Sequence, residues 1–375
     1  MHKLGWPEVS AWRLRRQHLD RRVAAGGMLD VASRLCGVHA QVLSCAELTL
    51  WARVEGLERN AVHRALWEDR TLVKTWAMRG TLHLLPASEL PLWHAGLRDN
   101  PRYYREAIWR RFGMTLDDLD RLTNAIAAAL NGSVMTREEL MKKVGRLTSA
   151  AFARKIGASS WGTILKPAAF SGGLCFGPSV GQRVRFTHPA TWLSSKLPPH
   201  DPKTAPRAIV RRYLAAYGPA TYHELARWWG GGGVSNARRW IAAMGSDVSE
   251  VELDGERRWM LTEDLRALHS TPATRIVNLL PGFDQYVVQA SGHAERLLPG
   301  TPRSRVYRPQ GWISPVLLIN GRMEGVWRHE VKGRRVEVTI EPFANVPGWA
   351  RRAAAEEAER LAAFLGGALE LKFGV

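Results

Sequence analysis

One order of secondary-structure elements recurs along the first two thirds of the chain, and it limits the fold more than any other feature. The stretch RAIVRRYLAAYGPATYHELARWWG, which begins at Arg207, predicts two helices separated by a Gly-Pro break. SNARRWIAAM predicts a third helix, and SEVELDGERRWMLT predicts two strands joined at an Asp-Gly turn. Three helices followed by a two-stranded hairpin indicate a winged-helix unit.

The same order occurs twice more towards the N-terminus. LDDLDRLTNAIAAALNGSVMTREELMKKVG predicts two helices, the second opened by a capping box of Thr136 and Glu139, and GLCFGPSVGQRVRFTH predicts a hairpin. Helices in EVSAWRLRRQHL, MLDVASRLCG and ERNAVHRALWEDR precede LVKTWAMRGTLHLLP, which predicts two strands about Arg79 and Gly80. We therefore expect tandem winged-helix units over residues 1–112, 113–200 and 201–268.

The hydrophobic pattern changes in the last third of the chain. TRIVNLLPGFDQYVV, WISPVLLINGRMEGVWRHE and RRVEVTIEPF have the period of two that is typical of strands, with Asn-Gly and Lys-Gly turns. Such short antiparallel strands predict a small closed or half-closed sheet, a β-barrel over residues 269–345, followed by an alanine-rich helix within 346–375. The predicted fold class is α+β.

An excess of basic residues indicates a polyanionic partner. The chain has 53 Lys and Arg against 35 Asp and Glu, a formal net charge of +18. No apolar run approaches the ~20 residues that a membrane-spanning helix needs, and the N-terminus lacks the apolar core of a signal peptide. We therefore expect a cytoplasmic protein that binds nucleic acid and no membrane.

Motifs for metal, nucleotide or serine-hydrolase chemistry are lacking. Cys36, Cys45 and Cys175 have no paired spacing, and neither H-E-x-x-H nor G-x-x-x-x-G-K-[ST] occurs. The one G-x-S-x-G match, GPSVG, stands between two predicted strands, so Ser179 is interpreted as a turn residue. We expect neither a metal nor another cofactor.

The stretch CGVHAQV places two polar side chains among apolar ones. In an extended segment His39 and Gln41 share one face, while Val38, Ala40 and Val42 share the other. Taken alone, His39 is more often a partly buried structural histidine than a catalyst, and Gln41 a surface or capping residue.

Four stretches in a fixed order resemble the winged-helix DNA glycosylases of the AlkZ and YcaQ type. They are GVHAQVLSCAELTLWARV, TWAMRGTLHLLPASEL, LLPGFDQY and YRPQGWISPVLLINGRMEGVWRH, and the resemblance extends over nearly the whole chain. It implies tandem winged helices packed with a C-terminal β-barrel. It also implies a catalytic motif of Gln, an apolar residue and a second Gln or Asp, onto which His39, Ala40 and Gln41 map, with His39 as a departure.

The resemblance implies a monofunctional glycosylase for N7-alkylated guanine, a base whose positive charge already weakens its glycosidic bond. Gln41 would stabilise the developing oxocarbenium ion and position a water, and a neutral His39 would act as general base. Activity would then fall at acidic pH, where histidine is protonated. No lysine occurs between Leu4 and Val73, so no amine for a Schiff-base lyase is close to the motif in sequence.

Members of this family resemble one another in tolerating bulky or cross-linking adducts. We therefore expect double-stranded DNA with alkylated purines as the partner, and bulky genotoxin adducts or interstrand cross-links as substrates. The departure at His39 suggests a branch that serves self-resistance to one genotoxin. No heptad helix is visible, which favours a monomer. A transcription regulator without catalytic activity and an architectural DNA binder with a decayed site remain as alternatives.

Six further residues are candidates for DNA contacts. They are Arg79 and His83 beside the first hairpin, Arg238 and Arg239 on the third helix of the last unit, and Arg308 and Trp312 in YRPQGWISP. The arginines could meet phosphates or, on the third helix, enter a major groove. The alternatives are a solvated turn for the first pair, internal helix packing for the second, and filling of the barrel core for the tryptophan.

Overall fold

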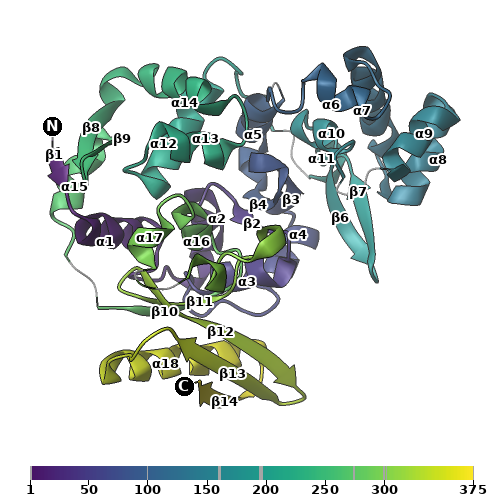
Figure 1. Cartoon of the computed structure of the whole chain (residues 1–375). Coiled ribbons are helices and arrows are strands. Elements are labelled where there is room, and N and C mark those ends of the chain that lie inside the picture. Colours follow the sequence, from purple (N-terminus) through teal and green to yellow (C-terminus); the bar gives the residue numbers. More distant parts are fainter. Residues whose placement is uncertain are drawn as a thin grey trace. The chain divides into compact units, whose positions relative to one another are not determined.

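The chain folds into two compact units, each assembled from segments that are far apart in the sequence. The computed structural model describes residues 2–98, 100–158, 162–193, 197–272, 275–298, 300 and 302–374. The first unit is formed by Met1–Ala61, Arg212–Glu224 and Gly245–Val375, and the second by Val62–Arg211 and Leu225–Met244. Figure 1 labels their helices and strands.

Helices account for much of both units. Those that contain first-unit residues alone are α1 (Trp6–Arg16), α2 (Met28–Arg34), α3 (Leu43–Trp51), α15 (Leu265–His269), α16 (Gln285–Ala290), α17 (Ala294–Leu297) and α18 (Gly348–Leu365). The remaining helices are α4 (Ala61–Trp67), α5 (Leu90–Leu97), α6 (Glu106–Arg110), α7 (Leu116–Leu130), α8 (Arg137–Leu147), α9 (Ala150–Ala158), α10 (Lys166–Phe170), α11 (Pro189–Trp192), α12 (Ala205–Tyr217), α13 (Tyr222–Trp229) and α14 (Gly233–Ala242). None of the described helices is long and apolar enough to cross a membrane.

A three-stranded sheet joins the N-terminus to a hairpin late in the chain. Strand β1 (His2–Leu4) runs parallel to β8 (Val248–Leu253), which is antiparallel to β9 (Glu256–Leu261). Asp254 and Gly255 both have positive φ, so the Asp-Gly pair forms the turn that was predicted. Val9 and Trp12 of α1 are buried in the core formed with these strands.

An open five-stranded sheet forms the C-terminal part of the first unit. Its order is β10 (Val277–Leu280), β11 (Val316–Ile319), β12 (Arg322–Lys332), β13 (Arg335–Pro342) and β14 (Ala368–Phe373). The first four strands are antiparallel neighbours, whereas β14 is parallel to β13. Helix α18 contacts β10, β13 and β14, and Figure 1 shows it lying along this sheet.

The closed barrel expected over residues 269–345 is therefore wrong. Strands β10 and β14 are the two edges of the sheet and do not pair, because α18 packs against both. The expected C-terminal helix is present, but the chain then turns at Gly366 (φ 79°) and adds β14, which the alanine-rich pattern did not reveal.

The second unit contains strands of two different sheets. Strands β3 (Leu72–Trp76) and β4 (Leu82–Pro86) are antiparallel about Arg79 and Gly80, as predicted. A further sheet has the order β5 (Val134–Thr136), β7 (Arg183–Thr187) and β6 (Cys175–Val180). Thr136 and Glu139 form the predicted capping box at the start of α8, with the Thr136 hydroxyl accepting from the Glu139 amide.

A buried group of charged side chains links the three segments of the first unit. Arg258 donates to Glu224 at 2.8 Å, and His293 Nδ1 lies 2.7 Å from the same carboxylate. Arg13 lies 2.9 Å from His293 Nε2. Because arginine only donates, Nε2 must accept and Nδ1 must donate, which makes His293 neutral. Burial lowers the pKa of His293 to about 4, although its bond to Glu224 acts in the opposite direction.

We expect this neutral histidine to make the fold sensitive to acid. With a pKa of about 4 when folded and 6.5 when unfolded, His293 takes up its proton mainly in the unfolded state as the pH falls through this window. The free energy of unfolding of the wild type should therefore drop by about 2 kcal/mol more than that of His293→Asn between pH 7.5 and 5.0. Urea denaturation at the two pH values measures this difference.

The Asn variant keeps a donor for Glu224 and removes the titrating group. His63→Asn is the matched control, because His63 is exposed. Equal pH dependence in the wild type and His293→Asn would contradict a neutral, buried His293.

Candidate functional site

The HAQ motif lies in a short link that is fixed at both ends by helices. Cys36 and Gly37 adopt positive φ after α2, and the Gly37 amide donates to the Ala32 carbonyl at 2.8 Å, closing the helix. Strand β2 (Val38–His39) follows, and α3 begins at Leu43. The expected extended conformation is thus present at the start of the motif, whereas Gln41 stands in a bend.

The two polar side chains of the motif differ in their surroundings. Val38 and Ala40 are fully buried, as the alternation predicts, and His39 is only 7% exposed. Gln41 is exposed, and its side chain makes no hydrogen bond with the part of the chain that is described. His39 is consequently held in the protein, while the Gln41 amide is accessible to a water or a ligand.

Three aromatic rings lead from His39 to the surface. The His39 ring stacks on Phe283 with centroids 5.3 Å apart and planes 21° apart. Phe283 in turn contacts Trp312, with centroids 5.3 Å apart and planes inclined by 50°. Trp312 is 52% exposed, so the interpretation of this residue as barrel core is wrong. The exposed ring of Trp312 is therefore connected to the buried His39 through contacts with Phe283.

The segment that carries Phe283 is tied to the protein on both sides of the motif. Phe283 has φ of 61°, an unusual backbone conformation for a bulky residue. Asp284 forms two hydrogen bonds with Arg53, at 2.7 and 2.8 Å, and caps α16 through the Tyr286 amide. Gln285 Nε2 donates to the Gly37 carbonyl at 2.5 Å. These bonds hold Phe283 in place against His39.

The ion pair of Arg53 and Asp284 is completely buried. Both side chains are 0% exposed, and Arg53 also donates to the Thr49 carbonyl at 2.9 Å. An isolated charge at such a depth is strongly unfavourable, so each residue requires the other.

The loop that carries Trp312 packs closely on Gly282. A Cβ atom on Gly282 would lie 2.9 Å from the Ile313 carbonyl oxygen, which is too short for a real contact. Only glycine therefore allows this approach of the two backbones. Arg308 is exposed in the same loop, and its amide donates to the Trp312 carbonyl at 2.8 Å.

The other predicted DNA contacts lie in the second unit. Arg79 is half-buried and donates to the Trp228 carbonyl at 3.1 Å, and His83 is fully buried with Nδ1 3.0 Å from the Thr81 carbonyl. Arg79 thus stands in the turn between β3 and β4 with its side chain partly covered, and His83 lies on β4 inside the protein. Arg238 and Arg239 are both exposed on α14. Of the six candidates, only Arg308 and Trp312 share the first unit with the motif.

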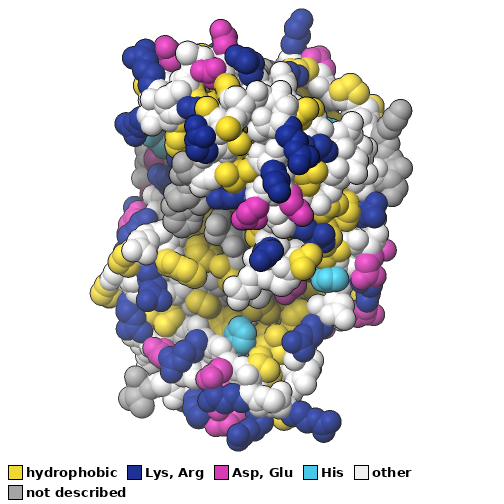
Figure 2. All heavy atoms as spheres, turned by 90° about the vertical axis from the view of Figure 1, so that its right-hand side faces the viewer, with side chains coloured by type: hydrophobic (Ala, Val, Ile, Leu, Met, Phe, Trp, Pro, Cys, Tyr) yellow, Lys and Arg dark blue, Asp and Glu magenta, His cyan; other side chains and the backbone are white. Residues whose placement is uncertain are grey.

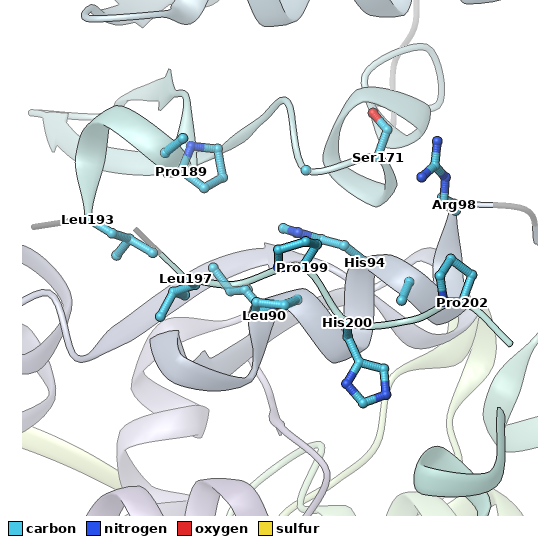
Figure 3. Close-up of a pocket in the computed structure, with 14 residues that line it drawn as sticks. Leu90, His94, Arg98, Ser171, Pro189, Leu193, Leu197, Pro199, His200 and Pro202 are labelled. Carbon is cyan, nitrogen blue, oxygen red and sulfur yellow. The ribbon is translucent and has the colours of Figure 1, made fainter. Parts of the chain in front are cut away.

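Figure 3 shows a cavity that is lined by residues of the second unit. Its volume is about 480 Å³, and its lining is mainly apolar, with Leu90, Leu193 and several prolines. Burial lowers the pKa of His94, which lines this cavity, to about 4. None of the motif residues lines it, so the cavity does not define the candidate site. Among the residues that are described, no group of three or more His, Cys, Asp or Glu could hold a metal ion.

Comparison with known proteins gives the chain its family. The family model for AlkZ-like DNA glycosylases matches residues 32–364. The chain belongs to the AlkZ-like DNA glycosylase family. It is accordingly a hydrolase of N-glycosyl bonds, and the matched range contains the motif, Phe283, Asp284 and Trp312.

A relative and a solved structure agree with this membership. The chain is 37% identical over 365 residues to the interstrand DNA cross-link repair glycosylase of Streptomyces sahachiroi, covering 96% of each chain. The structure of Streptomyces sahachiroi DNA glycosylase AlkZ superimposes with a TM-score of 0.88 at 35% identity, over 99% of this chain and 100% of that one. The AlkZ-like match gives no support to the transcription regulator.

Sequence reasoning missed the residues that hold the HAQ motif in place. LLPGFDQY carried part of the resemblance, but it did not indicate that Phe283 stacks on His39 or that Asp284 pairs with Arg53. The presence of a carboxylate and an amide in an otherwise apolar stretch was the available signal.

We expect the buried ion pair to be essential for the fold around the motif. Asp284→Asn leaves the Arg53 charge buried without a counter-ion, so the free energy of unfolding should fall by about 3 kcal/mol or more. Glu250→Gln, which breaks an exposed pair with Arg257, should change it by less than about 0.5 kcal/mol. Urea denaturation compares the two variants, and similar decreases would contradict the importance of the buried pair.

Proposed function

We propose that this glycosylase hydrolyses the N-glycosidic bond of N7-alkylated guanine in double-stranded DNA, with bulky genotoxin adducts or interstrand cross-links as its substrates. The observation that carries the proposal is the pairing of an exposed Gln41 with a His39 fixed by a ring stack. The Streptomyces sahachiroi relative, an interstrand DNA cross-link repair glycosylase, supports the choice of substrate.

The chemistry needs few groups because the alkylated base already carries a positive charge. It departs without protonation, which leaves the enzyme to stabilise the sugar cation and to direct a water onto it. The carbonyl oxygen of Gln41 is suited to both tasks, since the side chain is exposed and makes no hydrogen bond with a described residue. No covalent enzyme intermediate is required, and the product is an abasic site.

His39 serves as the general base in this mechanism. In its neutral form it accepts a hydrogen bond from the attacking water, whereas a protonated ring would repel the sugar cation. Phe283 covers one face of the ring, at 5.3 Å between centroids, and so restricts the plane in which the ring lies.

DNA recognition combines the exposed ring of Trp312 with basic residues. Trp312 offers a surface on which a base or a planar part of the adduct can stack, and the neighbouring Arg308 can meet a phosphate. Because Trp312 is exposed, a bulky adduct need not enter an enclosed pocket. Arg238 and Arg239 on α14 are the candidates for further DNA contacts.

We further propose the biological setting and the domain plan. The residues 1–112, 113–200 and 201–268 would act as winged-helix units on DNA, and the protein would work as a monomer at the nucleoid. Its biological task would be DNA repair, or self-resistance of an organism that makes the genotoxin.

Excision of the base tests the role of the motif directly. His39→Ala and Gln41→Ala should each lower the single-turnover release of N7-alkylguanine from labelled duplex DNA by at least ~10-fold, because each removes a group that acts only in the transition state. Both bulky and cross-linked adducts should be tried. Duplex binding without any base release by the wild type would instead favour an architectural DNA binder.

The pH profile separates His39 from other titrating groups. The excision rate of the wild type should fall from pH 8 to pH 5 as the general base becomes protonated. His39→Gln restores the residue that the resembling family has at this position, so this variant should remain active with a flatter profile. A wild-type profile that is flat over this range would argue against His39 as the base.

Phe283 is expected to position His39 rather than to touch the substrate. Phe283→Leu preserves an apolar side chain but removes the stacked ring, so kcat should fall roughly 5- to 10-fold with little change in KM. Phe283→Tyr keeps the ring and should retain most of the activity. Equal kcat values for the Leu variant and the wild type would exclude a positioning role.

A further inference from the structure

Arginine side chains surround a concavity in the first unit that has no part in the proposed mechanism. Its volume is about 750 Å³, and it is bordered by the end of α1, the following loop, the end of α2 and α15. The charged residues that line it are Arg15, Arg16, Arg21, Arg22, Arg34, Asp20 and Asp264. We call this concavity the arginine groove.

Two of the five arginines are engaged within the protein. Arg16 donates to the Ala215 carbonyl at 2.6 Å and lies 3.8 Å from Asp264. Arg22 forms an ion pair with Glu357.

The other three arginines have no such partner. The side chains of Arg15, Arg21 and Arg34 make no hydrogen bond or ion pair with any residue that the structure describes. Arg15 and Arg21 are exposed, and Arg34 is half-buried. Positive charge is therefore concentrated here without a full set of internal counter-ions.

Neighbouring groups respond to this concentration of charge. The pKa of His18 is lowered by burial and then by Arg34, and the pKa of Arg16 is lowered by the same two causes. Such like-charge crowding opposes folding, and it is relieved when an anion binds. The crowding is one of the reasons to expect a ligand for the groove.

We propose that the arginine groove binds the phosphodiester backbone of DNA, as a contact additional to the HAQ motif and Trp312. The guanidinium groups of Arg15, Arg21 and Arg34 would each pair with phosphate oxygens, for which their planar forks are suited. The choice of DNA rests on the proposed function.

The lining of the groove favours contacts to phosphates over contacts to bases. Trp12 is the only aromatic residue other than His18 among the lining residues, and it is 3% exposed, with Arg16 stacked over it at 5.1 Å. No exposed aromatic side chain among these described residues is thus offered to a base. Asp20 and Asp264 oppose a small free anion, whereas a strand that meets several arginines at once gains more than these carboxylates take away.

Basic residues are not confined to the groove. Figure 2 shows that Lys and Arg are spread over the whole face that it draws. The groove is therefore distinguished by the three arginines that have no partner among the described residues, and not by basic character alone.

The salt dependence of DNA binding tests the groove. The triple variant R15Q/R21Q/R34Q should bind undamaged duplex DNA at least ~10-fold more weakly at low salt. The slope of log K against log salt should become shallower by about 0.9 for each phosphate that is no longer neutralised. The single-turnover excision rate at saturating DNA should stay unchanged, because these residues do not belong to the motif.

A matched triple variant controls for the removal of charge. R257Q/R328Q/R335Q removes the same charge from exposed arginines that each have a glutamate partner, and it should leave the slope nearly unchanged. Equal slopes in the two triples would overturn the proposal. Thermal melting of both triples verifies that they fold.

Competition between inorganic phosphate and duplex DNA, at constant ionic strength, shows whether the groove binds the DNA backbone or a free phosphate ion. R15Q/R21Q/R34Q could lose the phosphate binding of the wild type and yet keep the same affinity for DNA. That result would make the groove a small-anion site and refute the proposal. Because undamaged DNA is the probe, the result does not depend on base excision. Failure of the wild type to release base would therefore count against the proposed function alone.

Discussion

The buried pair of Arg53 and Asp284 is the interaction on which the site depends. It joins the region just after α3 to the N-terminus of α16, and neither charge reaches solvent. Because the pair fixes Asp284, the preceding residue, Phe283, can be held at a φ of 61° and pressed against His39. The ion pair of Asp284 thus offsets the cost of the unusual backbone conformation at Phe283. Phe283 therefore gives the short link that carries the HAQ motif a fixed surface to pack against.

The distribution of charge over the protein follows from the same constraint, which is that a buried arginine requires a carboxylate partner. A chain of net charge +18 has few acidic side chains to neutralise arginines in its interior. Glu224 does so for Arg258 through direct contact and for Arg13 through a neutral His293, and this group links all three segments of the first unit. Carboxylates that pair with buried arginines are not available to arginines at the surface. Arg15, Arg21 and Arg34 of the arginine groove are thus left without a partner among the described residues, which suits a polyanionic substrate.

A feature was predicted correctly from the sequence where the residues that determine it are close together in the chain. The turn at Asp254 and Gly255 and the capping box at Thr136 are decided by neighbours in the sequence, and both were predicted correctly. The barrel was wrong because α18, and not the strands, determines that the sheet stays open. The position of His39 was recognised through the family resemblance. Its stacking partner was not, because no local pattern reports which distant ring will cover it.

The departure from glutamine at the first motif position can be understood from this packing. A glutamine amide is directed by hydrogen bonds, whereas an imidazole can also be directed by a ring that lies against its face. His39 is 7% exposed and stacked on Phe283, so its orientation is set by the clamp of Asp284 and Gln285. Gln41 stays exposed and adaptable beside it. If His39 is the base that we propose, a fixed imidazole stands next to an exposed amide, and adducts of different shapes can meet the amide while the base keeps its place.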